Sequence, residues 1–131
     1  ARYFVIATGS RAFVPPIPGL DQTPFLTNET VFENRTFPEH LIVIGGGPIG
    51  LEMAHAHRRL GCKVTLLEGK AIMPKDDPEL VAVVRDSVTA DGVILREGAT
   101  VVRTAKTASG VAVTIKGAAG EETIEGTHLL V

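Results

Sequence analysis

The sequence predicts an α/β fold: a parallel sheet flanked by helices, with a three-stranded antiparallel meander inserted before the last strand. Three observations indicate this fold. Residues 41–44 are a continuous run of mostly branched apolar residues, which is typical of a strand buried on both faces of a parallel sheet. A helical pattern follows this run, and another follows the second apolar run at residues 63–67. From residue 100 onward the hydrophobic period changes to two, which favours antiparallel strands.

A glycine-rich turn, GGGPIG at residues 45–50, connects the first predicted strand to a helix. Gly45 permits a tight turn, Gly47 lets the backbone approach a pyrophosphate, and Gly50 lets the helix lie close to the strand. Pro48 suits the first helical turn, where its missing N–H would have no intrahelical partner. The pattern predicts a Rossmann-like unit that binds dinucleotide phosphates at the helix N-terminus. A flavodoxin-like unit whose glycines serve only packing is the alternative.

An acidic residue follows the second predicted strand, residues 63–67. Glu68 lies 18 positions after Gly50, close to the offset at which an acid accepts hydrogen bonds from the adenosine ribose hydroxyls. A 2′-phosphate would meet the like charge of this carboxylate, so we expect NAD(H) in preference to NADP(H). Lys70 is a possible phosphate partner, but it lies beside the acid and lacks the forked geometry of arginine.

A second helix is predicted to begin at Asp77-Pro78-Glu79, which supplies an N-cap, a first-turn proline and an acid for the helix dipole. Gly92 is expected to end it, and residues 93–96 to form a third strand. The expected core face of this helix consists of Leu80, Val81, Val84 and Val88. The expected meander strands are 101–106, 111–116 and 122–125, and residues 127–131 are expected to return to the parallel sheet.

The N-terminal third has a different character. Residues 1–7 are apolar and β-prone, and residues 8–24 contain four of the eight prolines, as a linker does. Because both ends of the chain are apolar, we expect an excised domain: residues 1–37 as a strand and linker from a missing domain, and residues 38–131 as the nucleotide-binding domain. Residues 1–7 are expected to be disordered or to pair with another copy of the chain.

Composition excludes several function classes. The net charge of −2 and pI near 6.1 argue against a nucleic-acid surface, and no apolar stretch is long enough to span a membrane, so the default location is cytoplasmic. Cys62 is the only cysteine, which rules out an intrachain disulfide, and we interpret it as a buried, inert residue. His55 and His57 are two apart on a helix, so they point to different faces and are expected to be solvated and not metal ligands.

With these parts placed, the chain resembles the central NAD(P)-binding domain of the FAD-dependent pyridine nucleotide-disulfide oxidoreductases, the family of dihydrolipoamide dehydrogenase, glutathione reductase and mercuric reductase. Residues 5–10 (VIATGS) resemble the strand and turn that leave the family's flavin domain, and residues 16–19 (PIPG) its linker. Residues 37–54 match its nucleotide motif, including Glu52. Pro48 stands where many relatives carry an aromatic residue that gates the nicotinamide pocket.

The resemblance implies NAD(H) in this domain and FAD in a neighbouring domain of a homodimeric parent. Gly45, Gly47, Ile49 and Gly50 would hold the pyrophosphate and helix entry, Glu68 the adenosine ribose, and Glu52 the nicotinamide side. A reduced nicotinamide would then give its hydride to flavin, so this chain alone is not expected to be catalytic. The parent enzyme would pass its electrons to a disulfide, as dihydrolipoamide dehydrogenase does. The alternative is a flavoprotein of the NADH oxidase or ferredoxin reductase type, with a different electron acceptor. A non-catalytic NAD-sensing module is the competing class.

Overall fold

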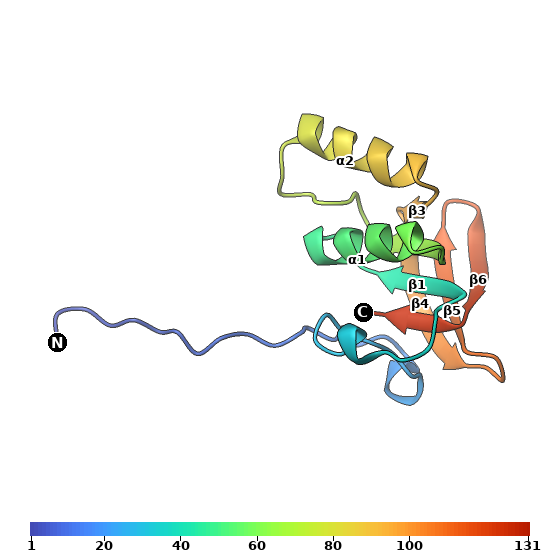
Figure 1. Cartoon of the computed structure of the whole chain (residues 1–131), viewed down its shortest axis with the longest axis horizontal. Coiled ribbons are helices and arrows are strands. Elements are labelled where there is room, and N and C mark those ends of the chain that lie inside the picture. Colours follow the sequence, from blue (N-terminus) through green and yellow to red (C-terminus); the bar gives the residue numbers. More distant parts are fainter.

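The computed structural model describes all residues, 1–131, and contains two sheets and two α-helices (Figure 1). The parallel sheet and its helices come first along the chain: β1 His40–Ile44, α1 Pro48–Arg59, β2 Lys63–Glu68, α2 Pro78–Ala90 and β3 Ile94–Glu97. The antiparallel strands and the last parallel strand follow: β4 Thr100–Lys106, β5 Val111–Gly117, β6 Gly120–Gly126 and β7 His128–Leu130. The predicted α/β fold is therefore confirmed, with strand ends shifted by one or two residues.

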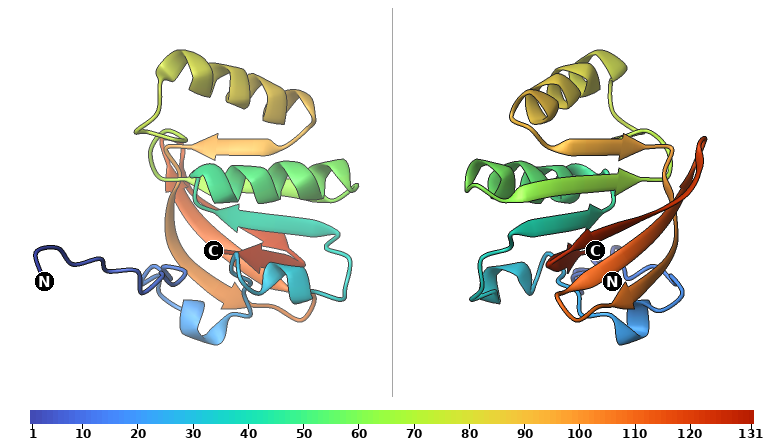
Figure 2. Two further views of the ribbon diagram at one scale, coloured as in Figure 1. Left: turned by 60° about the vertical axis from the view of Figure 1, so that its left-hand side comes forward. Right: turned by 90° about the vertical axis from the view of Figure 1, so that its right-hand side faces the viewer.

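The four strands of the parallel sheet have the order β3-β2-β1-β7, and all neighbours run in the same direction (Figure 2). From β1 the chain crosses to β2 and β3 on one side, and it returns to the other side of β1 only with β7. The strand order therefore reverses between β1 and β7. In open α/β sheets ligands bind outside the carboxyl ends of the strands at such a point.

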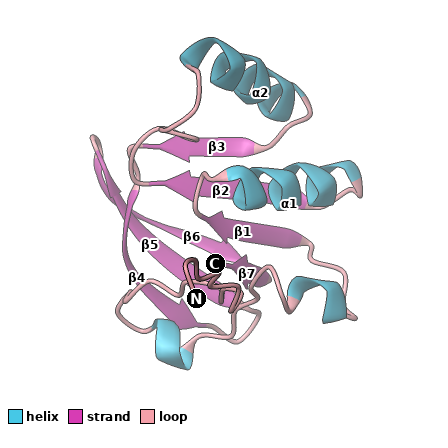
Figure 3. Cartoon of the chain, turned by 90° about the vertical axis from the view of Figure 1, so that its left-hand side faces the viewer, coloured by secondary structure: helices cyan, strands magenta, loops and turns pink.

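The molecule has three layers: the helices, the parallel sheet, and the antiparallel sheet with order β4-β5-β6 (Figure 3). Alternate residues of β1 show this directly. Leu41 and Val43 belong to the core cluster shared with both helices, whereas Ile42 belongs to the cluster shared with the meander. The helices thus cover one face of the parallel sheet and the meander covers the other, which buries β1 on both sides.

The N-terminal segment divides into two parts. Residues 1–14 contain no helix or strand. The first part of this segment extends away from the sheets, so the expected N-terminal strand finds no partner within this chain, whereas residues 10–13 lie beside the ends of β1 and β7 (Figure 1). Further along, Leu20 and Val31 are buried in the two core clusters, although they lie in the segment expected to be a linker. Leu26 also pairs with the end of the parallel sheet, since its N–H donates to Leu129 O at 2.7 Å.

The predicted start of α2 is confirmed. The side chain of Asp77 caps the helix by accepting from the N–H of Glu79 at 2.9 Å. Its predicted core face is partly wrong: Val81 and Val88 are buried and Val84 is half-buried, but the side chain of Leu80 is 67% exposed. Leu80 lies about 100° around the helix axis from Val81, which turns it toward solvent. No helix in the structure is both long and apolar enough to cross a membrane.

Candidate functional site

The glycine turn lies at the carboxyl end of β1, beside the point where the strand order reverses. Gly45 has φ +115°, a backbone conformation that side-chain-bearing residues rarely adopt. Its N–H donates to Leu67 O at 2.9 Å, which continues the pairing of β1 with β2 into the turn. The tight turn predicted at Gly45 is therefore present, and it requires glycine.

The first turn of α1 presents free hydrogen-bond donors. Gly47 is the N-cap and no side chain caps the helix. The N–H groups of Gly47, Ile49 and Gly50 find no acceptor within the chain, and a Cβ added to Gly47 would meet no atom within 4 Å. Unpaired N–H groups at the positive end of a helix dipole, with open space beside them, suit a phosphate oxygen.

Gly50 allows α1 to approach the turn closely. A Cβ at this position would lie 2.1 Å from the carbonyl oxygen of Gly45 and 3.5 Å from Cγ1 of Val43. One helical turn later Ala54 is fully buried against the sheet. The sequence predicted close packing at Gly50, and this prediction is confirmed.

Glu68 lies directly beside the turn. Its Oε2 accepts from the N–H of Gly46 at 2.8 Å, and its Oε1 accepts from the N–H of Lys70 at 2.9 Å. Each carboxylate oxygen has a second lone-pair direction, so two such bonds leave capacity for ribose hydroxyls. Sequence reasoning assigned no role to Gly46, although a Cβ there would come within 3.0 Å of Cβ of Glu68 and 2.8 Å of Cγ2 of Ile72. The run of three consecutive glycines was the available signal.

Lys70 is exposed, and its ammonium group is in no ion pair. Its backbone, in contrast, is fixed at both ends, because its N–H donates to Glu68 and its carbonyl oxygen accepts from the N–H of Gly98 at 3.0 Å. The structure thus places a free cation next to the acid at the end of β2. The Glu68 carboxylate and the Lys70 ammonium, the two groups that the sequence suggested for the adenosine ribose or its phosphate, thus come from neighbouring positions at the end of β2.

A pocket of about 280 Å³ opens beside the turn, at the carboxyl ends of β1 and β7. Ile44, Ile49 and Gly50 form one wall and Leu130 and Val131 another, and residues 10–13, 28 and 29 of the N-terminal segment line the remainder. The side chain of Ile49 is 53% exposed at its edge. The pocket has a mixed lining, with apolar side chains from both sheet ends and polar groups from residues 10, 11, 28 and 29. It also adjoins the free N–H groups of α1, so it suits a flat, partly polar ring of a ligand whose phosphates lie at the helix N-terminus.

Glu52 lies one helical turn beyond this pocket. Its exposed side chain, with Pro48, His55 and Met73, lines a separate groove of about 200 Å³ between α1 and α2. Of the predicted site residues, the structure therefore gathers Gly45, Gly47, Ile49, Gly50 and Glu68 around one turn, with Lys70 at its rim. Glu52 and Pro48 are on the neighbouring helix face.

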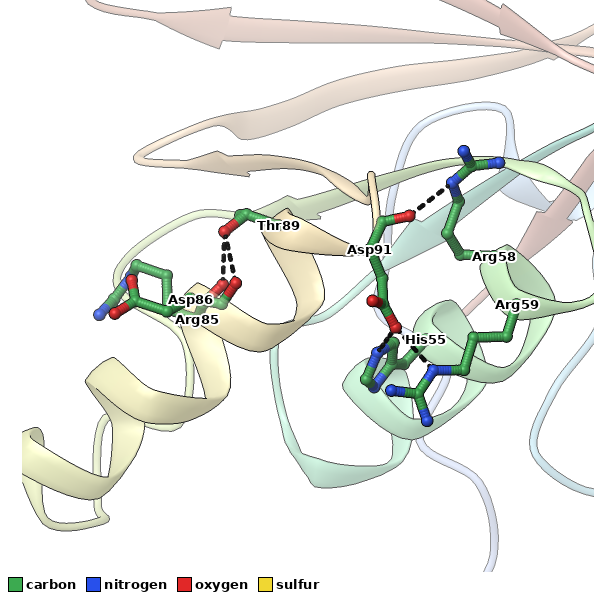
Figure 4. Close-up of polar contacts among 7 residues, drawn as sticks. All are labelled: His55, Arg58, Arg59, Arg85, Asp86, Thr89 and Asp91. Carbon is green, nitrogen blue, oxygen red and sulfur yellow. Dashed lines mark hydrogen bonds and ion pairs between the residues drawn. The ribbon is translucent and has the colours of Figure 1, made fainter.

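His55 is not simply a solvated surface residue, as the sequence suggested. Its Nε2 lies 2.6 Å from Oδ2 of Asp91, and Nε of Arg59 lies 2.6 Å from the same oxygen (Figure 4). Arg58 adds a bond from Nε to the carbonyl oxygen of Asp91 at 3.0 Å. The hydrogen bonds from Arg59 and then His55 hold the pKa of Asp91 below its usual range. This cluster ties the end of α1 to the end of α2, which sequence spacing alone cannot show.

Cys62 is 1% exposed and forms no disulfide. Burial raises the pKa of its thiol, which disfavours the reactive thiolate. Both facts agree with the structural role that the sequence suggested.

Comparison with known proteins adds a family to this geometry. Residues 1–131 match the family described as pyridine nucleotide-disulphide oxidoreductase. The chain is 34% identical over 131 residues to a mercuric reductase of Streptomyces lividans. The aligned region is 100% of this chain and 28% of that protein. Among solved structures, the HOCl-induced flavoprotein disulfide reductase RclA of Escherichia coli superposes with a TM-score of 0.85 at 29% identity, over 95% of this chain and 28% of that one.

A water-forming NADH oxidase of Lactobacillus brevis, solved with bound NADH, has a TM-score of 0.80 at 28% identity, over 94% of this chain and 28% of that one. The chain therefore spans about 28% of the length of these relatives.

Proposed function

Since the chain belongs to the family of pyridine nucleotide-disulphide oxidoreductases, we propose that it is the NAD(H)-binding domain of an FAD-dependent enzyme. One observation carries the proposal: the Glu68 carboxylate and the free N–H groups at the start of α1 flank the same glycine turn, with Gly46 bonded directly to Glu68. A dinucleotide needs both groups at this spacing, because its pyrophosphate and its adenosine ribose are neighbours.

Different residues bind different parts of the dinucleotide. The N–H groups of Gly47, Ile49 and Gly50 hold the pyrophosphate, and Glu68 accepts from the ribose hydroxyls. The pocket beside Ile49 receives the nicotinamide ring, because it lies on the opposite side of the phosphate position from Glu68. The family resemblance assigns Glu52 to the nicotinamide side, although here Glu52 lines the separate groove between α1 and α2 and not the pocket beside Ile49. When bound, NADH supplies the hydride, and the chain contributes position and exclusion of water.

Glu68 also supports NAD(H) over NADP(H). Its two oxygens are partly used by the N–H groups of Gly46 and Lys70, which fixes the carboxylate beside the ribose position. A 2′-phosphate there would face a fixed like charge, and the single ammonium of Lys70 offers no bidentate contact.

The remainder of the enzyme follows from the family. We propose that residues 1–37 connect this domain to a flavin domain that carries FAD, and that residues 38–131 form the nucleotide-binding domain. The electrons then go to a disulfide, as in dihydrolipoamide dehydrogenase, or to a related acceptor. The likeness to an NADH oxidase supports a second candidate, in which dioxygen is the acceptor. The first candidate requires a redox-active cysteine pair that this chain does not supply, because Cys62 is single and buried, whereas the second candidate does not require such a pair.

Calorimetric titration of the chain with NADH and with NADPH tests the proposal. We expect NADH to bind more tightly, by about tenfold, which corresponds to 1.4 kcal/mol. Glu68→Gln is expected to reduce that preference, because it removes the charge that repels a 2′-phosphate. Glu79→Gln, at an exposed acid in the first turn of α2, is the matched control and is expected to leave the preference unchanged. Tighter binding of NADPH, or an unchanged preference in Glu68→Gln, would overturn the proposal.

A further inference from the structure

The loop of residues 69–77, which connects β2 to α2, lies against the glycine turn. The side chain of Ile72 is 1% exposed, and its Cγ2 is the atom that a Cβ on Gly46 would meet at 2.8 Å. The N–H of Met73 donates to the carbonyl oxygen of Gly46 at 2.9 Å. Gly46 is therefore held on two sides: Glu68 accepts from its N–H, and Met73 donates to its carbonyl.

A second acid holds this loop from the other side. Oε1 of Glu97, the last residue of β3, accepts from the N–H of Ile72 at 2.8 Å. Arg85 of α2 donates two hydrogen bonds to the carboxylate of Glu97. Its Nε lies 2.9 Å from Oε2 of Glu97, and its Nη2 lies 2.9 Å from Oε1. A forked pair of this kind fixes the orientation of a carboxylate as well as its charge.

These contacts form one continuous path from α2 to the site. Arg85 orients Glu97, Glu97 holds Ile72, and Ile72 with its neighbour Met73 packs on Gly46. Gly46 then bonds Glu68. The side chains of Arg85 and Glu97 form no hydrogen bond with residues 45–50, so their contacts reach the turn through the loop. The backbone of Glu97 also pairs with that of Glu68 in the parallel sheet, and a side-chain substitution leaves this pairing in place.

We propose that Glu97, oriented by Arg85, is a positioning residue for the dinucleotide site: it fixes the loop of residues 69–77 against Gly46 and thereby sets the place of the Glu68 carboxylate. The identity of the ligand in this inference rests on the proposed function. The hold of Glu97 on the loop does not, since it is a property of the chain alone.

Two variants separate positioning from general stability. Glu97→Ala removes the acceptor of Ile72 and the partner of Arg85. Asp91→Ala is the matched control, because it removes the ion pairs that tie the C-cap of α2 to Arg59 and His55 and leaves the bonds of the loop in place (Figure 4). Each variant thus removes one polar attachment of α2, at Arg85 in the middle of the helix or at its C-cap, Asp91. In each, hydrogen exchange at the amides of Ile72 and Met73 and the affinity for NADH are measured on the 131-residue chain.

In Glu97→Ala we expect exchange at both amides to accelerate by about tenfold or more. Affinity for NADH is expected to fall by about fivefold or more, because the turn and the acid lose their fixed spacing. In Asp91→Ala both quantities are expected to stay within about twofold of the unmodified chain. If Glu97→Ala fails to fold, Glu97→Gln is measured by the same two readouts. Glutamine keeps an acceptor for the N–H of Ile72 but loses the charge that holds Arg85. Smaller changes in exchange and in NADH affinity, in the same directions, are therefore expected.

Equal effects in Glu97→Ala and Asp91→Ala would overturn the inference, as would faster exchange without loss of affinity. If the unmodified chain binds neither NADH nor NADPH, the proposed function fails. The exchange data alone then decide whether Glu97 holds the loop, and unchanged exchange at Ile72 and Met73 in Glu97→Ala would refute that as well.

Discussion

Gly50 and Gly45 approach so closely that the carbonyl oxygen of Gly45 occupies the position of a side chain on Gly50, since a Cβ built there would lie 2.1 Å away. The contact joins the start of α1 to the end of β1 and so sets the width of the turn between them. Gly47 lies between these two glycines in the sequence and has nothing within 4 Å of its own Cβ position. One motif therefore contains glycines that serve different purposes, and substitution separates them.

Gly50→Ala is expected to destabilise the fold. The added methyl group would collide with backbone and not with a flexible side chain, so α1 must move away from the sheet, at a cost of about 3 kcal/mol, the upper end for overpacking. Urea unfolding of the chain followed by circular dichroism measures the loss. A midpoint equal to that of the unmodified chain would show that the helix can shift freely.

Gly47→Ala is expected to leave the fold intact and to impair binding. Its φ of −76° and ψ of 177° suit alanine, so stability should change by no more than about 0.5 kcal/mol. The methyl group would occupy the open space proposed for the pyrophosphate, and NADH affinity should fall by about tenfold or more. The same unfolding assay is the control, and calorimetry is the test. Undiminished affinity would place the phosphates elsewhere.

Acid is expected to destabilise the chain first through two half-buried histidines, His40 and His128. Burial and then the charge of Lys63 lower the pKa of His40, and burial lowers that of His128 as well. The unfolded chain then binds more protons than the folded chain below the ordinary value of 6.5, so stability is full above that pH and is lost as pH falls from there through the lowered pKa. Thermal unfolding between pH 7.5 and about 5 measures the trend.

The double variant His40→Gln, His128→Gln should flatten this part of the pH profile, because glutamine does not titrate. Glu97 and Asp91 also have lowered pKa values, but they lose their contribution at a more acidic pH, as it falls through those values. A profile between pH 7.5 and about 5 that is equally steep in the variant would assign the acid sensitivity to other groups.

Cys62 is expected to resist thiol reagents in the native chain. Its side chain is 1% exposed and burial raises the pKa of its thiol, so modification requires local opening. Labelling by a chromogenic disulfide should be on the order of 100-fold slower in buffer than in denaturing urea. Rapid labelling without denaturant would make Cys62 a candidate reactive thiol and remove its purely structural interpretation.

The features that sequence predicts well are those encoded within a few residues. The turn at Gly45, the close approach at Gly50 and the cap at Asp77 each follow from local backbone demands, and the structure shows all three. The offset to Glu68 also follows, because a helix of known rise and a return strand leave little freedom. The positions predicted from the sequence therefore agree with the structure for the fold class and for the residues that flank the glycine turn.

The features that sequence misses depend on which elements become neighbours. The fork between Arg85 and Glu97 joins α2 to β3, and the pair of His55 with Asp91 joins α1 to the end of α2. Charged residues of this kind look like ordinary surface residues until the helices are placed. Leu80 was misassigned for the same reason, since the direction in which α2 faces the sheet is a tertiary property.

The late return of β7 has a consequence for how the molecule folds. His40 and Thr127, which bond where β1 meets the last strand, are 87 residues apart in sequence, whereas β1 and β2 are joined by a single short helix. Closing so long a loop is entropically costly and slow, so β1, α1 and β2 are expected to associate before β7 docks. The pocket beside Ile49 then lacks the wall formed by Leu130 and Val131 until that step, so the part of the site proposed for the nicotinamide would be the last to form.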